Sequence, residues 1–444
     1  MDTPICNFVK EYAEKSPKRF HMPGHKGKDV LGFEKYDVTE IKGADSLYEA
    51  DGIIAQSENN VSSLFGCKTL YSTEGSSLCI RAMFYLATLY ANEQKKELCV
   101  FAGRNAHKTF VSASSLLGFE VEWLKGKNES SYLSFSIDTD ELETALSNSN
   151  KTNVVYVTSP DYLGNVSDIK TISQICKKHN AMLFVDCAHG AYLKFLKDDL
   201  HPITLGADVC CDSAHKTLPV ITGGAYLHIA DNAPEIFKSF AKQALSLFGS
   251  TSPSYLILQS LDYANKLIRE GYCQKLEDVC KKVEETKKSL SSCGYFIYGN
   301  EPLKLTILAK KHGYTGVELA ETLRKDNIEC EFADPDYIVF MFSANTDGFE
   351  LLRLQNSLSA IPKKQEITTL PPRLSIPKKE MDIRKATLSI SEKLPIENCL
   401  GRTASITSVG CPPAVPIVVP GEVIDENAVE CFKYYGIETC IVVK

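Results

Sequence analysis

The sequence predicts an α/β fold built on a mostly parallel sheet, and three observations support this prediction. Short apolar runs alternate with helix-length amphipathic segments through the first two-thirds of the chain. Valine, isoleucine and phenylalanine dominate these runs, as expected when helices cover both faces of a sheet. Polar residues collect where the runs end, which is the edge where open α/β sheets bind ligands. We therefore expect a large ligand-binding domain followed by small α+β domains.

Each expected strand is a short apolar run, and the helices follow through a glycine or a polar turn. We expect strands within residues 69–73, 97–103, 152–160, 181–190 and 206–216, and helices within residues 76–94, 107–118 and 168–180.

The rest of the chain predicts a long helix, a small α+β unit and a linker. Prolines in the segment 411–422 forbid a central strand there and predict a rigid extended loop. A stretch rich in proline and lysine is typical of a linker. The expected parts are a helix at 254–292, a small unit at 294–360 with strands within 303–309 and 336–344 around a helix at 316–327, and a linker at 361–385.

Composition and charge exclude several classes of protein. The chain has 444 residues, 44% hydrophobic and 24% charged, enough for a large core and two or three domains. Its net charge is −7 without a long basic run, so we expect no nucleic-acid partner, whereas a cationic small molecule suits this balance. No signal-peptide core opens the chain, and no stretch approaches the ~18 apolar residues of a membrane span. We predict a soluble, cytoplasmic protein without a membrane partner.

Sixteen cysteines are spread along the chain without any C-x-x-C pair. Cys210 and Cys211 fall in an expected strand, where buried free thiols are common. We interpret the cysteines as reduced core residues rather than a disulfide framework or a metal site, and we predict no metal.

Polar residues at the expected strand ends form a candidate site. Gly75, Ser76 and Ser77 open a helix whose free N–H groups and dipole suit an anion such as phosphate; an ordinary N-cap by either serine is the alternative. Asp186 ends a strand, where it either stabilises a nearby cation or forms a turn. His107 follows another strand, and a lone histidine in such a turn is more often structural.

Lys216 directly follows His215 at the end of another apolar run. A lysine held back from water becomes a nucleophile able to form a Schiff base. An anion seat, a histidine, a strand-end aspartate and a later lysine, in this order, meet the needs of pyridoxal 5′-phosphate. Asp186 precedes Lys216 by 216 − 186 = 30 residues, room for one strand–turn–strand excursion. We therefore predict this cofactor, with Lys216 as the Schiff-base lysine.

Motifs along nearly the whole chain carry a resemblance to a known family: "RFHMPGHKG", "GRNAHKTF", "VTSPDYLGNVSDI", "VDCAHGAYLKF", "DSAHKTLPVITGGAYLH", "STSPSYLILQSLDYA", "GRTASI" and "VVPGE". The chain resembles the Orn/Lys/Arg decarboxylase family, fold type I enzymes that use pyridoxal phosphate, in the short bacterial form without an N-terminal wing domain. The resemblance implies a fold type I (aspartate aminotransferase-like) major domain at 61–293. An N-terminal arm at 1–60 would line the active site, and a C-terminal domain of the decarboxylase type would span 386–444.

The resemblance also implies residue roles. Lys216 would bind the cofactor aldehyde, Asp186 would pair with the pyridinium nitrogen, His107 would stack on the ring and His189 would lie beside it. The phosphate would be held by Gly75, Ser76, Ser77, Ser213 and His215.

Further positions would belong to the subunit interface and the entrance. The turn 250–254, with Thr251 and Ser252, resembles the segment that reaches the phosphate of a neighbouring subunit, so we expect at least a homodimer with shared active sites. His25, within "HMPGHKG", and Glu422 would line the entrance, and these two residues and Asp45 are the candidates for contact with the substrate.

The implied reaction is loss of CO₂ from a basic amino acid, feeding polyamine synthesis. Arginine is the first choice of substrate, giving agmatine, and lysine or ornithine come next. A guanidinium favours a bidentate carboxylate, for which Asp45, Glu49, Asp51 and Glu422 are the candidates. Two alternatives stay open: a pyridoxal-phosphate-binding protein without catalysis, and another fold type I reaction such as an aminotransferase, whose carboxylate clamp could only come from Arg324, Arg353, Arg373, Arg384 or Arg402.

Four positions depart from the family pattern. Cys187 stands where the family usually has glutamate, and Glu74 where it has asparagine. Gly223 replaces a glutamine, and "PPAVP" replaces "PPGIP". None of these changes removes a catalytic group, but together they bear on substrate preference.

Overall fold

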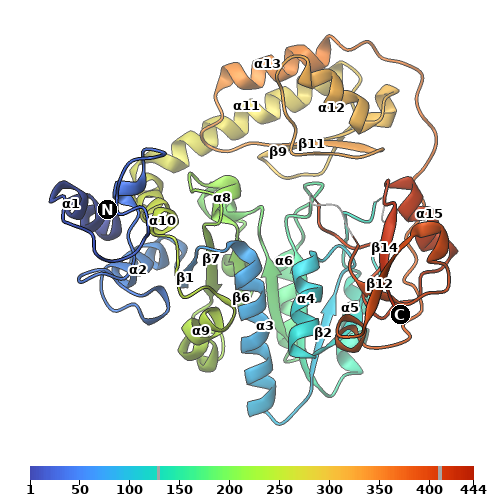
Figure 1. Ribbon diagram of the computed structural model, residues 1–444. Helices are drawn as coiled ribbons and strands as arrows, with labels where there is room; N and C mark the ends of the chain where they lie inside the picture. Colours follow the sequence, from blue (N-terminus) through green and yellow to red (C-terminus); the bar gives the residue numbers. More distant parts are fainter. Residues whose placement is uncertain (128–130, 409–412) are drawn as a thin grey trace. The chain divides into compact units, whose positions relative to one another are not determined.

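The computed structural model describes residues 1–127, 131–408 and 413–444 (Figure 1). The chain divides into two compact units. Unit 1 contains Met1–Lys96, Ile169–Gln174 and Met182–Lys275, and unit 2 contains Glu97–Asp168, Ile175–Ala181 and Leu276–Lys444.

Unit 1 is built on four strands: β1 (Lys68–Ser72), β5 (Met182–Asp186), β6 (Val209–Asp212) and β7 (Ala225–Ile229). Their order is β1-β7-β6-β5, with β5 parallel to β6, and β7 antiparallel to both β6 and β1. Every residue of β5, β6 and β7 is buried, which explains why these runs are continuously apolar rather than alternating.

Helices bury this part of the sheet. α3 (Gly75–Glu93) contacts all four strands and packs against α9 (Glu235–Phe248), as Figure 1 shows. The other helical elements of unit 1 are α1 (Pro4–Glu14), η1 (Glu34–Tyr36), η2 (Leu47–Glu49), α2 (Ile53–Phe65), η3 (Ala191–Phe195), α7 (Pro202–Leu205), α8 (Ala214–Thr217), α10 (Tyr255–Leu267) and η4 (Ile268–Tyr272). α6 (Ile169–Lys178) and α11 (Cys273–Ser292) each run from unit 1 into unit 2.

The prediction of one helix over residues 254–292 is wrong. The helical geometry breaks between α10 and α11, at Glu270 (φ −103°, ψ 53°) and Gly271 (φ 97°). Glycine reaches positive φ without the steric cost that other residues meet, so the break falls at this residue.

Unit 2 contains three parallel strands, β2 (Leu98–Ala102), β3 (Glu120–Trp123) and β4 (Thr152–Thr158), in the order β4-β2-β3. Its smaller sheets are antiparallel, in the orders β10-β11-β9-β8 and β12-β14-β13. The strands of these sheets are β8 (Ile297–Tyr298), β9 (Lys304–Leu308), β10 (Phe332–Ala333), β11 (Tyr337–Met341), β12 (Ser391–Pro395), β13 (Ala404–Ile406) and β14 (Thr439–Val443).

The helices of unit 2 are α4 (Lys108–Leu117), α5 (Thr139–Ser147), η5 (Ala309–His312), α12 (Gly316–Arg324), α13 (Gly348–Ser359), α14 (Ile383–Thr387), η6 (Ile396–Asn398) and α15 (Glu426–Tyr434). Of these, α4 and α12 match the predicted segments 107–118 and 316–327. Residues 362–378 contain neither helix nor strand, α14 begins at Ile383, and the linker expected at 361–385 stays a prediction. The predicted proline loop begins outside the described residues, and 413–420 contain neither helix nor strand.

The α/β class with mostly parallel strands is thus confirmed. No described helix has the length and apolar character needed to cross a bilayer. Fifteen cysteines lie in the described part of the chain, and all are free. Of these, only Cys273 and Cys293 are exposed, whereas Cys210, Cys211 and most of the others are buried.

Candidate active site

The predicted anion seat lies at the N-terminus of α3. The N-cap residue is Glu74, without a side-chain capping bond, so the alternative of a serine N-cap is wrong. Gly75 has a φ of 71°, and apart from its chain neighbours and the backbone of its own helix no atom of the described residues lies within 4 Å of the position that a Cβ would take there. The Ser213 hydroxyl donates to the Ser76 hydroxyl across 2.8 Å. Open space at a helix N-terminus beside two hydroxyls is a geometry that suits a phosphate.

Gly223 holds this helix start in place. Its carbonyl accepts a hydrogen bond from the Gly75 amide at 2.7 Å. Its φ is 102°, and a Cβ there would lie 2.9 Å from the Thr73 carbonyl oxygen. A glutamine at this position would therefore be strained, which gives the departure at Gly223 a structural reason.

The carboxylate of Glu74 bonds to the backbone rather than standing beside the seat without a partner. Its Oε1 accepts a hydrogen bond from the Ser250 amide at 2.6 Å. This bond joins the seat to the turn 250–254, where Thr251 and Ser252 are exposed. The reach of these two residues to a neighbouring subunit stays a prediction.

Lys216 lies on α8, directly after β6, and its Nζ is 2.8 Å from Nε2 of His189. His189 is buried and Lys216 is partly buried. A bond between an amine and an imidazole nitrogen needs one donor and one acceptor, so the two groups share a proton. The pair can therefore take up and deliver a proton as a unit.

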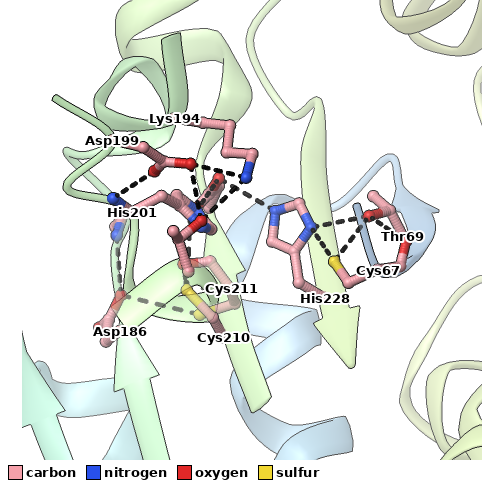
Figure 2. A network of polar contacts seen from close by, with 12 residues as sticks. Cys67, Thr69, Asp186, Lys194, Asp199, His201, Cys210, Cys211 and His228 are labelled. Atoms are coloured by element: carbon pink, nitrogen blue, oxygen red, sulfur yellow. Dashed lines mark hydrogen bonds and ion pairs between the residues drawn. The ribbon is translucent and has the colours of Figure 1, made fainter. Parts of the chain in front are cut away.

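Asp186 is the last residue of β5 and is buried. Its Oδ1 accepts from the Ala188 amide at 3.1 Å and from the Cys211 thiol at 3.8 Å (Figure 2). Asp186 pairs with Cys211 in the parallel ladder of β5 and β6. Since Lys216 follows β6, the aspartate and the lysine both come from the carboxyl ends of neighbouring parallel strands.

His215 is less suited to its predicted phosphate role. Its Nδ1 lies 3.0 Å from the Gly224 carbonyl oxygen, so this nitrogen must carry hydrogen and donate. Burial lowers the pKa of His215 and so favours the neutral ring, with the nearby Lys216 charge acting in the same direction. The Nε2 of a neutral ring in this tautomer only accepts, so a bond to phosphate would require the protonated form.

The predicted entrance residues of unit 1 have local partners. His25 contacts Asp37 at 3.1 Å through Nε2, and its Nδ1 accepts from the Gly27 amide at 3.0 Å. Asp45 is buried, and its Oδ2 accepts from the amides of Gly52 and Ile54 at 2.9 and 2.7 Å. Asp45 thus fixes the start of α2, and its contact with substrate stays a prediction.

Two predicted site residues belong to unit 2. His107 is the N-cap of α4, and its Nδ1 accepts from the Thr109 amide at 3.2 Å, so it has a structural task; its stacking on the cofactor stays a prediction. Glu422 forms a buried two-bond ion pair with Arg104, at 3.1 and 3.2 Å. A substrate guanidinium would have to compete with Arg104 for this carboxylate, because the pair already has the fork geometry that arginine needs.

Comparison with known proteins identifies relatives along almost the whole chain. The sequence profile of the Orn/Lys/Arg decarboxylase major domain matches residues 3–298, and that of the C-terminal domain of the same family matches residues 372–439. An arginine decarboxylase of Bacillus subtilis is 27% identical over 97% of this chain and 93% of the relative. One of Halalkalibacterium halodurans is 28% identical over 96% and 91%.

Solved structures share the fold. A lysine decarboxylase of Francisella novicida superposes with a TM-score of 0.81 at 18% identity, covering 99% of this chain and 79% of that one. The constitutive lysine decarboxylase of E. coli gives a TM-score of 0.76 at 17% identity, covering 100% and 82%.

Proposed function

Because the chain belongs to the Orn/Lys/Arg decarboxylase family and is therefore a pyridoxal-phosphate-dependent amino-acid decarboxylase, we propose that it converts L-arginine to agmatine and CO₂. The relatives named arginine decarboxylase, which match along nearly their full length, support arginine before lysine and ornithine. The amine product would enter polyamine synthesis. The proposed location is the cytoplasm.

The residues of unit 1 fit the cofactor. The open space at Gly75, with the Ser76 and Ser213 hydroxyls beside it, suits the phosphate. The buried carboxylate of Asp186 suits a protonated pyridine nitrogen, because an opposite charge nearby favours the protonated form. Lys216 supplies the amine that the aldehyde requires.

When bound, pyridoxal phosphate supplies the electron sink for the bond that releases CO₂. Asp186 holds the proton on the pyridine nitrogen, and so keeps that sink strong. Lys216 binds the cofactor and then yields its place to the substrate amine. His189, in contact with Lys216 Nζ, takes a proton from this amine or returns one, so that Lys216 can protonate Cα after CO₂ has left.

The Lys216–His189 contact carries the proposal, because it gives the Schiff-base lysine a proton partner inside unit 1. The test offers L-arginine, L-lysine and L-ornithine separately to the purified protein with added cofactor, and measures CO₂ and amine. Release from arginine well above the other two, abolished in Lys216→Ala, is the expected result. Release only from lysine or ornithine would reject arginine, and no release from any of them would reject the substrate class.

We also propose a homodimer with shared active sites, on the resemblance of the turn 250–254 to an intersubunit segment. Light scattering should give the dimer mass. Mixing an inactive Lys216→Ala chain with an inactive chain altered at Thr251 and Ser252 should restore activity, because half of the mixed sites would be intact. If dimers that contain one chain of each variant form and the mixture still recovers no activity, this result would argue against shared sites.

A further inference from the structure

A fully buried cluster of polar side chains lies beneath the site and takes no part in the proposed reaction. Asp212 ends β6, and its carboxylate contacts Nε2 of His201 at 3.1 and 3.3 Å. His228, on β7, places its own Nε2 3.0 Å from the same carboxylate. All three side chains are fully buried.

Two thiols complete the cluster. One ligand atom each from Cys187, His201, Cys210 and Asp212 lie within 4.8 Å of one another. All four residues have an exposed fraction of 0%. Burial of so many polar groups is costly unless a strong interaction binds them together.

We propose that Cys187, His201, Cys210 and Asp212 form a closed, four-coordinate zinc site. Bond lengths of about 2.3 Å to sulfur and about 2.0 Å to nitrogen or oxygen place tetrahedral neighbours roughly 3.3 Å apart for N–O and roughly 3.5 Å for S–O. The nitrogen–oxygen distances from His201 to Asp212 are 3.1 and 3.3 Å, and Cys210 Sγ is 3.8 Å from Asp212 Oδ1. Small side-chain shifts therefore bring these atoms into the ligand geometry.

The two histidines, His201 and His228, differ in the hydrogen-bond partners of their ring nitrogens. His228 has a partner at each nitrogen, since its Nδ1 lies 2.9 Å from the Thr69 hydroxyl. The Nδ1 of His201 has no hydrogen-bond partner among the described residues. Without a metal, the Nε2–H of His201 donates to Asp212, because a carboxylate only accepts. Zinc would take the place of this hydrogen at Nε2, and the ring proton would then reside on Nδ1. His228 would instead orient the Asp212 ligand from outside the coordination shell.

Zinc binding would change the charge and the proton content of the cluster. Zn²⁺ displaces one proton from each thiol and forms two sulfur–metal bonds, so two protons leave to solvent. Two thiolates and the Asp212 carboxylate give three negative charges against two on the metal. The Nε2–H of His228 lies 3.0 Å from Asp212 and donates to this carboxylate, which partly offsets the remaining negative charge.

The position of the cluster indicates a structural task. With four protein ligands and no open position, the metal would not activate a substrate. Cys187 directly follows Asp186, and Asp212 directly precedes Ser213 of the seat. Zinc would therefore pin the carboxyl ends of β5 and β6, which hold these residues. This revises the interpretation of Cys187 and Cys210 as ordinary core thiols and gives the change from glutamate at residue 187 a chemical purpose.

The first test is the metal content of the purified holoenzyme, measured by plasma mass spectrometry before and after incubation with zinc chloride and gel filtration. We expect one zinc per chain in the wild type, loss of most of it in Cys187→Ser and Cys210→Ser, and full retention in Cys99→Ser. Cys99 is a matched control because it is a buried strand thiol outside the cluster. A wild type that stays free of zinc, or equal loss in all three variants, would overturn the proposal.

The second test needs no variant and therefore does not depend on their folding. Protein loaded with Co²⁺ in place of zinc should show the intense ligand-field bands of tetrahedral cobalt together with thiolate-to-cobalt charge transfer. The weak spectrum of six-coordinate cobalt, or a Cys187–Cys210 disulfide in a non-reducing peptide map, would overturn the proposal. Both readouts are separate from CO₂ release, so their failure would leave the proposed reaction intact.

Discussion

The Nζ atom of Lys216 lies 2.8 Å from Nε2 of His189, and the two side chains reach each other from segments that follow different strands, β6 and β5. The Lys216 amine, which we propose binds the cofactor, thus has an imidazole within hydrogen-bond distance. Because one of the two nitrogens must donate and the other accept, removal of the imidazole should remove a proton partner of Lys216.

Replacement of His189 by glutamine should slow the reaction at the proton-transfer steps. We expect kcat to fall by roughly 10²-fold, the lower range for loss of a general acid–base group, and the pH profile of kcat to lose one limb. Cofactor content should stay near that of the wild type. His179→Gln is the control, because His179 is partly buried and is not one of the predicted site residues. It should leave kcat and the pH profile unchanged. A normal kcat and pH profile in His189→Gln would contradict this role.

Replacement of Asp186 by alanine should weaken the electron sink. We expect kcat to fall by roughly 10³-fold at saturating cofactor, as for loss of a group that stabilises charge in the transition state. Steady-state CO₂ release, with the bound cofactor counted in the same sample, separates this effect from poor cofactor binding. Asp231→Ala removes an exposed carboxylate and should be neutral. A loss explained wholly by missing cofactor would assign Asp186 to binding alone.

Loss of Arg104 should destabilise unit 2. Burial raises the pKa of Glu422 even though the guanidinium of Arg104 opposes this effect, so removal of Arg104 leaves the buried carboxyl with the Val419 amide but without an opposite charge. We expect Arg104→Met to cost about 3–5 kcal/mol, and the double change Arg104→Met with Glu422→Leu to cost less than the single one. Urea unfolding of the single and double variants measures the difference. Strictly additive costs would show that the pair is not coupled.

Asp334 should make stability depend on pH. Burial raises the pKa of Asp334 to about 7, and the neighbouring Asp336 adds to the shift. The stabilising contribution of the neutral carboxyl is complete below the unfolded-state pKa of about 3.9 and is lost as pH rises through about 7, because the unfolded chain releases its proton first. Asp334→Asn stays neutral, so its unfolding free energy should gain about 2–3 kcal/mol relative to the wild type between pH 5 and pH 8.

Urea unfolding at these two pH values measures this gain. The Oδ1 position of Asp334, which accepts from the amides of Asp336 and Tyr337, is kept in the asparagine variant. A constant difference between the two proteins over this pH range would contradict the prediction.

The elements of the sheet could be predicted because burial on both faces produces continuous apolar runs, as in β5 and β6. The break at Gly271 could not, since the helical periodicity continues on both sides and a single glycine is tolerated within a helix. Tertiary contacts, rather than local pattern, decide whether such a glycine bends the chain.

The candidate site shows the same division. The positions of Asp186 and Lys216 at the sheet edge could be predicted, because Asp186 ends a buried strand and Lys216 follows another, whereas their roles toward the cofactor stay predictions. The ion pair between Arg104 and Glu422 could not be predicted, because the two residues are 318 positions apart in the sequence. Nothing in the sequence near either residue indicates that the two segments meet. The cluster of Asp212 with His201 and His228 was missed for the same reason: three separate segments supply it, and each residue alone is typical of an ordinary strand or turn.

Because most described cysteines are buried, the reactivity of the thiols toward a reagent in solution indicates whether the chain is folded. Burial raises the pKa of Cys99 to about 12, and most other cysteines are similarly shielded, whereas Cys273 and Cys293 face solvent. Among the fifteen cysteines of the described residues, an alkylating reagent counted by mass spectrometry should therefore add quickly to Cys273 and Cys293 in the folded protein, and to all fifteen once the chain unfolds. The number of alkylated cysteines per chain can therefore rank the variants by the fraction of unfolded protein, without an optical probe.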